Sequence, residues 1–204
     1  MTLTRTPVNL ITGFLGAGKT TTILGLLATR PAGERWAVLV NEFGKVRIDV
    51  STLEDGAGGV VVREVSGCIC CTGQIAMRVV LTRLLRETRP DRLLIEPGLG
   101  HLSGIINFLQ DAQAMQALDL RATVCIIDPR QYSDPDIAAR EDYREQIRLA
   151  DVLVINGRGP AAPEEFALAK RAAAGFSPAK ITVFETGHEK LDPALLDANA
   201  CGKK

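Results

Sequence analysis

Short apolar runs recur along the chain and alternate with segments whose apolar residues recur at helical spacing. Buried parallel strands read as continuous apolar runs, whereas the helices that cover them show one apolar face. The alternation therefore predicts an α/β fold, with a mostly parallel sheet of about seven strands and helices on both faces. The expected strands are residues 8–12, 36–41, 59–65, 91–96, 122–128, 151–156 and 180–185. The expected helices are residues 19–29, 73–88, 104–117, 135–149 and 163–173.

The composition fits one globular domain. Hydrophobic residues make up 46% of the chain, which is enough for a sizeable core, and no repeat or low-complexity linker interrupts the pattern. We therefore expect a single domain over residues 1–204. Lys plus Arg and Asp plus Glu both number 24, so the formal net charge is +0. This balance argues against a nucleic-acid-binding or membrane-surface protein.

The cellular location follows from what the chain lacks. It has no apolar run of about 18 residues, so no transmembrane helix is expected. Its first residues, MTLTRTPVNLITGFLG, do not read as a signal peptide. The prediction is a cytoplasmic protein, a compartment in which structural disulfides are rare.

The segment GFLGAGKT, residues 13–20, matches the phosphate-loop pattern G-x-x-x-x-G-K-[ST] at every fixed position. It follows an expected strand and opens an expected helix, as that motif requires. Gly13, Gly16 and Gly18 let backbone N–H groups turn toward phosphate oxygens. Lys19 is expected to reach the β- and γ-phosphates, and the Thr20 hydroxyl to hold Mg²⁺. Nucleoside triphosphate chemistry is thus the leading function class.

An acidic residue at a second strand end is also expected near the magnesium ion of such an enzyme. The segment LLIEPGLG supplies Glu96 at that position. The alternative interpretation of Glu96 is a helix-capping or surface carboxylate.

The segment EVSGCICCTGQ places Cys68, Cys70 and Cys71 within four residues. A disulfide, a redox couple, plain burial and a metal site each remain open, although the cytosol disfavours the first two. Three thiolates in a turn flanked by glycines suit Zn²⁺, Cu(I) or, with less preference, Co²⁺. Tetrahedral Zn²⁺ takes four ligands, so this cluster is one ligand short and able to exchange its metal. His101 and His188 are weak candidates for the missing ligand.

Four segments occur in one order: GFLGAGKTT (13–21), VNEFGKVRIDV (40–50), GCICC (67–71) and IEPGLGH (95–101). In this respect the chain resembles the CobW-like metallochaperone GTPases, relatives of the urease and hydrogenase nickel-insertion GTPases. The resemblance extends over nearly all of the chain, to ETGHEKLDPALLD near its end. It implies a GTPase fold of the signal-recognition/MinD-like class (SIMIBI) and the delivery of a transition metal, commonly zinc or cobalt.

The resemblance also implies roles for individual residues. It extends the phosphate-binding set to Ala17 and Thr21 and adds Asn156 to the nucleotide-binding residues. The segment from Glu42 to Asp49 resembles the first switch of the family. Glu42 is the candidate fourth metal ligand beside the C-x-C-C motif, since it follows an early strand. The expected catalytic residues are Lys19, Asp49 and Glu96, with Asp49 positioning water or supporting Mg²⁺, unless it is only a solvated carboxylate.

Three departures from the family pattern weaken parts of this interpretation. The guanine-reading motif N-K-x-D is here Asn156-Gly157-Arg158-Gly159, so base specificity is in doubt, with ATP use, relaxed specificity or a degenerate site as alternatives. The segment IEPGLGHLSG is one residue shorter than the usual second switch and lacks the usual Pro after His101, which puts the hydrolysis rate in doubt. The usual smaller C-terminal domain is expected to be absent.

Two functions follow. The first is a slow GTPase that couples GTP binding and hydrolysis to the delivery of Zn²⁺ or Co²⁺, with GTP/GDP and Mg²⁺ as cofactors. A client metalloprotein is the expected partner, and a nucleotide-dependent homodimer is implied by the family alone. The second is a non-hydrolysing metal sensor or buffer with a degenerate nucleotide site. A small-molecule kinase is a weaker third reading, because it gives no reason for the cysteines.

Overall fold

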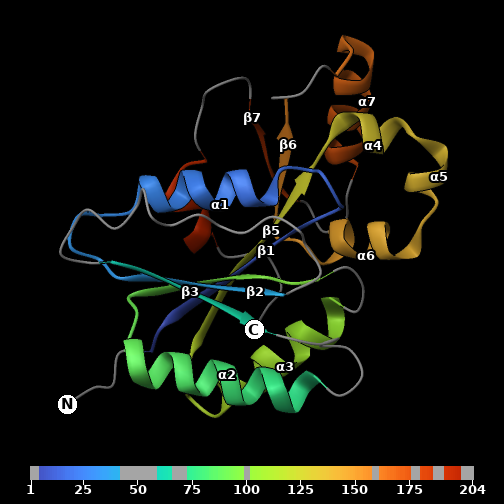
Figure 1. Ribbon diagram of the computed structural model, residues 1–204. Coiled ribbons are helices and arrows are strands. Elements are labelled where there is room, and N and C mark those ends of the chain that lie inside the picture. Colours follow the sequence, from blue (N-terminus) through green and yellow to red (C-terminus); the bar gives the residue numbers. More distant parts are fainter. Residues whose placement is uncertain are drawn as a thin grey trace. The chain divides into compact units, whose positions relative to one another are not determined.

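The structure is a computed structural model (Figure 1). It describes residues 5–41, 59–65, 73–98, 102–157, 161–175, 180–185 and 191–198. Within this part of the chain, no helix is long and apolar enough to cross a membrane.

The chain divides into two compact units. The first unit comprises Met1–Leu10 and Leu27–Arg121, and the second unit comprises Ile11–Leu26 and Ala122–Lys204. The division falls within two strands, β1 (Pro7–Gly13) and β5 (Asp119–Ile127), so each of these strands contributes residues to both units. Compact units of this kind can belong to one domain. The expectation of a single domain over residues 1–204 therefore stays a prediction.

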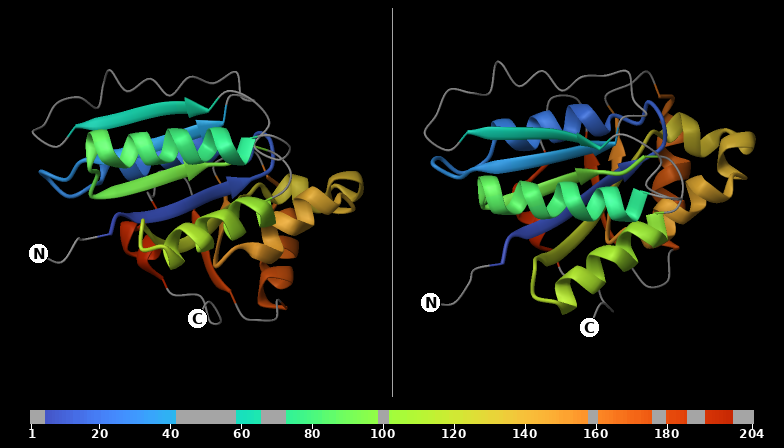
Figure 2. Two further views of the ribbon diagram at one scale, coloured as in Figure 1. Left: turned by 90° about the horizontal axis from the view of Figure 1, so that it is seen from below. Right: turned by 60° about the horizontal axis from the view of Figure 1, so that its bottom comes forward.

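The first unit contains a parallel sheet. Its strand order is β3 (Val60–Val65), β2 (Trp36–Asn41), β4 (Arg92–Glu96) and β1. The register pairs Asn41 with Val65 across β2 and β3, and Val40 with Glu96 across β2 and β4. The three strands therefore end at the same edge of the sheet. The helix α2 (Gly73–Thr88) lies along these strands, and α3 (Leu102–Ala114) belongs to the same unit (Figure 2).

The second unit contains the parallel strands β5, β6 (Val152–Asn156) and β7 (Ile181–Glu185). Most of α1 (Lys19–Ala28) also belongs to this unit. Three short helices follow β5 along the chain, and α7 and a 3₁₀ helix follow later (Figure 1). Their bounds are α4 (Pro129–Ser133), α5 (Pro135–Ala138), α6 (Glu141–Leu149), α7 (Pro163–Ala174) and η1 (Pro193–Asp197).

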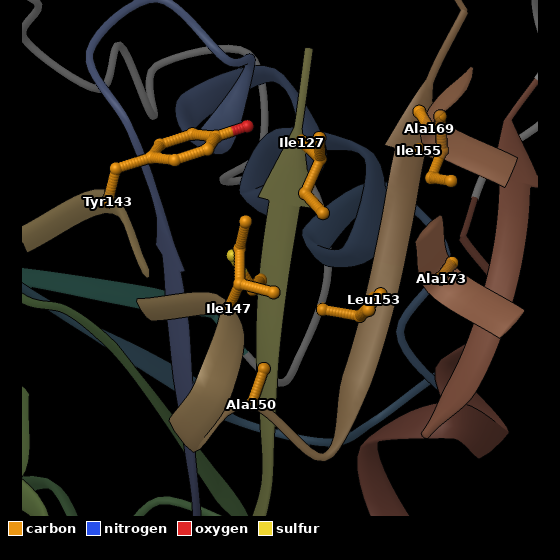
Figure 3. Close-up of a cluster of buried hydrophobic side chains, with 9 residues drawn as sticks. Ile127, Tyr143, Ile147, Ala150, Leu153, Ile155, Ala169 and Ala173 are labelled. Atoms are coloured by element: carbon orange, nitrogen blue, oxygen red, sulfur yellow. The ribbon is translucent and has the colours of Figure 1, made fainter. Parts of the chain in front are cut away.

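An apolar cluster fixes α6 and α7 on β5 and β6. Figure 3 shows Tyr143 and Ile147 of α6 beside β5, and Ala169 and Ala173 of α7 beside β6. The small side chains of α7 let that helix approach the strand closely. The cluster consists of Cys125, Ile127, Tyr143, Ile147, Ala150, Leu153, Ile155, Ala169 and Ala173. It fixes the carboxyl ends of β5 and β6, where chemistry is expected in a parallel sheet.

The predicted α/β class and parallel sheet are confirmed, and seven strands are present among the described residues. Most bounds agree within two residues. The strand expected at residue 122 begins earlier, at Asp119, because the Asp119 N–H donates to the Thr6 carbonyl at 3.0 Å and extends the strand by three residues, two of them charged.

The continuous helix predicted over residues 135–149 is wrong, because this segment forms two helices, α5 and α6. Arg140 between them has an extended backbone, with φ −68° and ψ 132°. Its guanidinium lies over the Phe14 ring, while Arg144 Nε donates to the Ala138 carbonyl at 2.7 Å and satisfies the end of α5. The interruption thus follows from side-chain contacts that helical periodicity does not reveal.

Candidate functional site

In the loop between β1 and α1, Gly13, Gly16 and Gly18 have positive φ values, and at Gly13 and Gly18 a side chain would also meet close neighbours. Gly13 has φ 143°, and a Cβ atom there would lie 2.5 Å from the Ile126 carbonyl oxygen. Gly18 has φ 104°, and a Cβ atom there would lie 2.5 Å from Asn156 Nδ2. Both the positive φ values and the close neighbours exclude a larger residue. The fixed glycines of the motif are therefore required by the geometry of the loop.

The residues expected to bind phosphate lie together at this loop. Lys19 is the first residue of α1, and its ammonium donates to the carbonyls of Gly13 (3.0 Å) and Phe14 (3.2 Å). Thr20 is half-buried and Thr21 is exposed in the same first turn. The first N–H groups of a helix carry a partial positive charge and attract anions. The loop thus presents its lysine and a helix N-terminus at one place.

Asn156, the last residue of β6, contacts the loop rather than standing apart from it. Its Nδ2 donates to the Ala17 carbonyl at 2.8 Å. The structure therefore brings Asn156 to the phosphate loop, 139 positions away in the sequence. Arg158 and Gly159, which belong to the changed guanine-reading segment, lie outside the described residues.

Two glutamines that sequence reasoning missed also hold the loop. Gln131 of α4 donates from Nε2 to the Leu15 carbonyl at 2.6 Å. Gln146 of α6 is buried, and its Oε1 accepts from the Gly13 N–H at 2.9 Å and from the Thr12 hydroxyl at 3.1 Å. These pairs are separated by 116 and 133 residues in sequence. No motif spacing in this chain pointed to either glutamine.

The Phe14 side chain anchors the loop to α6. Its ring meets the Tyr143 ring edge-on, with the centroids 5.7 Å apart at an interplanar angle of 87°. The Arg140 guanidinium lies 5.3 Å from the Phe14 centroid. A hydrogen bond between Arg140 and Asp142 raises the pKa of Arg140 and lowers that of Asp142, so both groups stay charged at neutral pH. The loop is therefore held by packing as well as by hydrogen bonds.

Asp128, just after β5, is another acidic residue near the loop, but it has a structural role. Its carboxylate caps α4 by accepting from the Arg130 N–H at 3.0 Å, and it pairs with the Arg130 guanidinium. This hydrogen-bonded pair raises the pKa of Arg130. Asp128 thereby orients the short helix that carries Gln131.

Cys125 lies in the core of the second unit, away from solvent. It is 2% exposed, and burial raises the pKa of its thiol to about 12. A thiol with that pKa is protonated at neutral pH, whereas a metal ligand must be a thiolate. Cys125 is therefore a packing residue.

In the first unit, Glu96 is the last residue of β4 and is half-buried. The neighbouring strands β2 and β3 end together at the paired residues Asn41 and Val65. Glu42 follows Asn41 directly, and Cys68 comes three positions after Val65 in the sequence. The sequences expected to hold a transition metal thus leave the sheet from adjacent strand ends.

The predicted metal ligands and switch residues Glu42, Asp49, Cys68, Cys70 and Cys71 lie outside the described residues. So do Gly100, His101, His188 and Cys201. In the part of the chain that the structure describes, no three His, Cys, Asp or Glu side chains gather as a metal site.

A buried strand, a glycine loop, a lysine and threonine at a helix start and a parallel sheet define this chain as a P-loop nucleotide-binding protein. Comparison with known proteins narrows the class. The family model for the CobW/HypB/UreG nucleotide-binding domain matches residues 7–180. The chain therefore belongs to the CobW/HypB/UreG family, in agreement with the resemblance seen in its motifs.

Three known proteins illustrate the relationship. The zinc chaperone YeiR of Escherichia coli K12 is 50% identical over 164 residues, 79% of this chain and 49% of that protein. The chain thus spans about half the length of this curated relative. The zinc-bound YjiA GTPase of E. coli aligns with 26% identity and a TM-score of 0.65, over 97% of this chain and 63% of that structure.

The signal recognition particle 54 kDa protein of Aeropyrum pernix K1, solved with GDP, shares the fold alone. Its TM-score is 0.53 at 17% identity, over 91% of this chain and 42% of that structure. The predicted relation to the signal-recognition class of GTPase folds is confirmed at the level of the fold.

Proposed function

We propose that this chain is the nucleotide-binding part of a GTP-dependent zinc-delivery protein. The observation that carries the proposal is the phosphate loop, in which Lys19, the start of α1 and two constrained glycines lie together. The metal in the proposal is the cargo, and its identity is inferred from relatives: YeiR is a zinc chaperone, and YjiA is a GTPase solved with Zn²⁺.

In this proposal the second unit binds the nucleotide. The β- and γ-phosphates lie against the N–H groups of residues 16–20, and Lys19 neutralises part of their charge. Thr20 supplies a hydroxyl oxygen, a hard donor of the kind that Mg²⁺ prefers, so the donor chemistry fits this ion. When bound, Mg²⁺ would neutralise charge on the phosphates. That Glu96 joins Thr20, and that Asp49 positions the attacking water, stay predictions of the sequence.

Base selection is a separate question, because the usual lysine and aspartate are replaced in Asn156-Gly157-Arg158-Gly159. The Asn156 amide is directed to the Ala17 carbonyl, which supports a role in shaping the loop. We propose that GTP is the physiological substrate, since the relatives are GTPases, and that discrimination against ATP is weakened by about 1–3 kcal/mol for the missing carboxylate.

The proposed cargo site is Cys68, Cys70 and Cys71 with Glu42. Support comes from the register of the first unit, where β2 and β3 are adjacent and end at the paired residues Asn41 and Val65. Neighbouring strands lie about 4.8 Å apart. The chain therefore departs toward Glu42 and toward Cys68 from neighbouring positions. A thiolate-rich set of this kind suits Zn²⁺ and also accepts Co²⁺.

Coupling would run through the segment from Glu42 to Asp49. We propose that γ-phosphate orders this segment, and that hydrolysis changes whether Glu42 completes the cargo site. To swing metal occupancy almost fully, the nucleotide state must change the metal-binding free energy by about 5 kcal/mol. Structural zinc sites are worth about 10–16 kcal/mol, so the gain or loss of one ligand is on the right scale. A client metalloprotein would receive the metal.

The test is a titration of the reduced 204-residue chain with Co²⁺ and Zn²⁺, alone and with Mg²⁺–GTP, Mg²⁺–ATP or a non-hydrolysable GTP analogue. Thiolate-to-cobalt charge-transfer absorption reports the cysteines directly. Cys125 is buried in the core of the second unit, so we expect no contribution of that thiol to the signal. A variant with Ser at positions 68, 70 and 71 should lose the absorption, and Lys19→Ala should lose only its response to nucleotide.

Cobalt affinity that shifts with GTP, together with steady-state phosphate release, would support the proposal. By linkage, the metal must then change GTP affinity by the same factor. Metal binding that ignores nucleotide, with no phosphate release, would replace the proposal by the metal sensor or buffer. Absence of any thiolate signal would remove the metal role.

A further inference from the structure

Three side-chain amides hold alternate residues of the phosphate loop. Gln146 from α6 accepts from the Gly13 N–H at 2.9 Å, Gln131 from α4 donates to the Leu15 carbonyl at 2.6 Å, and Asn156 from β6 donates to the Ala17 carbonyl at 2.8 Å. The motif explains the glycines and the lysine of the loop, but it does not explain these three supports.

The alternation has a physical reason. A loop that turns successive N–H groups toward an anion must turn carbonyl oxygens away from it. Carbonyls that point away need donors, and neutral amides supply them without adding a charge that competes for phosphate. Gln131 and Asn156 satisfy two such carbonyls. Gln146 differs from them, because it is an acceptor and because it is 3% exposed.

Gln146 acts on the residue that also anchors Lys19. The Gly13 N–H is held by Gln146 Oε1, and the Gly13 carbonyl accepts from the Lys19 ammonium at 3.0 Å. The peptide groups on both sides of the Gly13 Cα are thus fixed by side chains from α6 and α1. The Thr12 hydroxyl donates to the same Gln146 oxygen at 3.1 Å and orients it.

We propose that Gln146 is a positioning residue for the nucleotide. It fixes the point at which β1 ends and the loop begins, and through Gly13 it places the Lys19 ammonium. Without the acceptor, the Gly13 N–H is buried and unpaired, so we expect Gly13 to rotate toward another partner and to weaken one of the two carbonyl contacts that hold the Lys19 ammonium. This inference rests on the proposed binding of nucleoside triphosphate.

The experiment compares Gln146→Met with Gln113→Met. Methionine is unbranched, favours helices and lacks the acceptor. Gln113 is a matched control in the first unit, because its Oε1 accepts a backbone N–H, that of Leu120 at 2.6 Å, in the same way. The dissociation constants for Mg²⁺–GTP and Mg²⁺–GDP are measured by calorimetry, and the melting temperature is measured without nucleotide.

We expect Gln146→Met to raise the dissociation constants by about tenfold or more, since small displacements of positioned groups are costly in binding sites. Gln113→Met should lower the melting temperature while leaving both constants within about twofold of the original protein, because its hydrogen bond supports Leu120 in β5 and not the phosphate loop. A purely structural Gln146 would instead behave as Gln113 does.

A second pair of variants, at Thr12, tests the inference even if Gln146→Met does not fold. Thr12→Val removes the hydroxyl that orients Gln146, and Thr12→Ser keeps it. The valine variant should bind GTP about three times more weakly and the serine variant should match the original protein, in proportion to one neutral hydrogen bond. The inference would be overturned if folded Gln146→Met bound GTP as tightly as the original protein. It would also be overturned if Thr12→Val and Thr12→Ser bound GTP equally well. An original protein that binds no nucleotide would overturn the proposed function itself.

Discussion

Strand β1 carries two buried polar side chains, Asn9 and Thr12, and the two halves of the strand use them differently. In the first unit, Asn9 accepts from Arg92 at 2.7 Å, and the Arg92 guanidinium lies 5.4 Å from the Trp36 ring centroid. In the second unit, Thr12 donates to Gln146, which also holds Gly13 at the start of the phosphate loop.

Asn9 and Thr12 show that one half of β1 contributes to stability and that the other half contributes to the expected ligand site. The Asn9 contacts join β1 to β4 and to the Trp36 side chain within the first unit, so they stabilise its sheet. The Thr12 contacts lead to residues that are expected to meet phosphate. The burial of a polar residue in a strand therefore does not by itself identify its role. Its hydrogen-bond partner shows whether it stabilises the sheet or positions a ligand-binding residue.

The largest effect on ligand binding is expected for Lys19→Ala. This change removes the ammonium that bonds Gly13 and Phe14 and that is expected to neutralise phosphate charge. GTP affinity should fall by at least about a hundredfold, ~3 kcal/mol, because charge-assisted bonds to phosphate are strong. Calorimetry checks this. Retained affinity in the variant would mean that the loop does not bind phosphate.

For Arg92→Met, stability and binding should separate. The variant leaves the buried Asn9 without the guanidinium and should lose about 2 kcal/mol of the free energy of unfolding. Urea denaturation measures that loss. GTP affinity of the folded variant should equal that of the original protein, and a parallel loss of both would erase the contrast between the two halves of β1.

A smaller effect is expected for Asn156→Ala. It removes the donor to the Ala17 carbonyl and should weaken GTP binding by about tenfold, ~1.4 kcal/mol, since one neutral hydrogen bond and the loop conformation it holds are lost. Competition of GTP against ATP gives a further readout. An equal loss for both nucleotides fits a role in shaping the loop, whereas a loss confined to GTP would assign Asn156 to the base.

The smallest effect is expected at the exposed pair of Arg83 and Glu87 on α2. Their contact is 2.6 Å, but the side chains are 76% and 48% exposed. Exposed helical pairs of this type contribute little to stability because water and salt screen the charges, so Arg83→Ala should barely move the urea midpoint. This variant sets the baseline, and a larger loss would show that α2 has an unrecognised contact at that position.

Some elements of this fold are encoded locally in the sequence, and others depend on distant contacts. Continuous apolar runs located β2 and β6 closely, because their burial is local in sequence. A single helix is predicted over residues 135–149, but it is interrupted at Arg140, whose guanidinium lies over the Phe14 ring. The apolar residues of this segment still recur at helical spacing. The interruption arises from a contact with Phe14, which is distant in sequence.

The sequence by itself determined the parallel α/β class, the phosphate loop and the family, because these are encoded in contiguous residues with fixed spacing. Only the tertiary structure decided that Gln131, Gln146 and Asn156 hold that loop, and that β2 and β3 end side by side. Hydrogen bonds between residues more than 100 positions apart leave no spacing in the sequence. They arise only when the strands pair and the helices pack, which brings their donors and acceptors together.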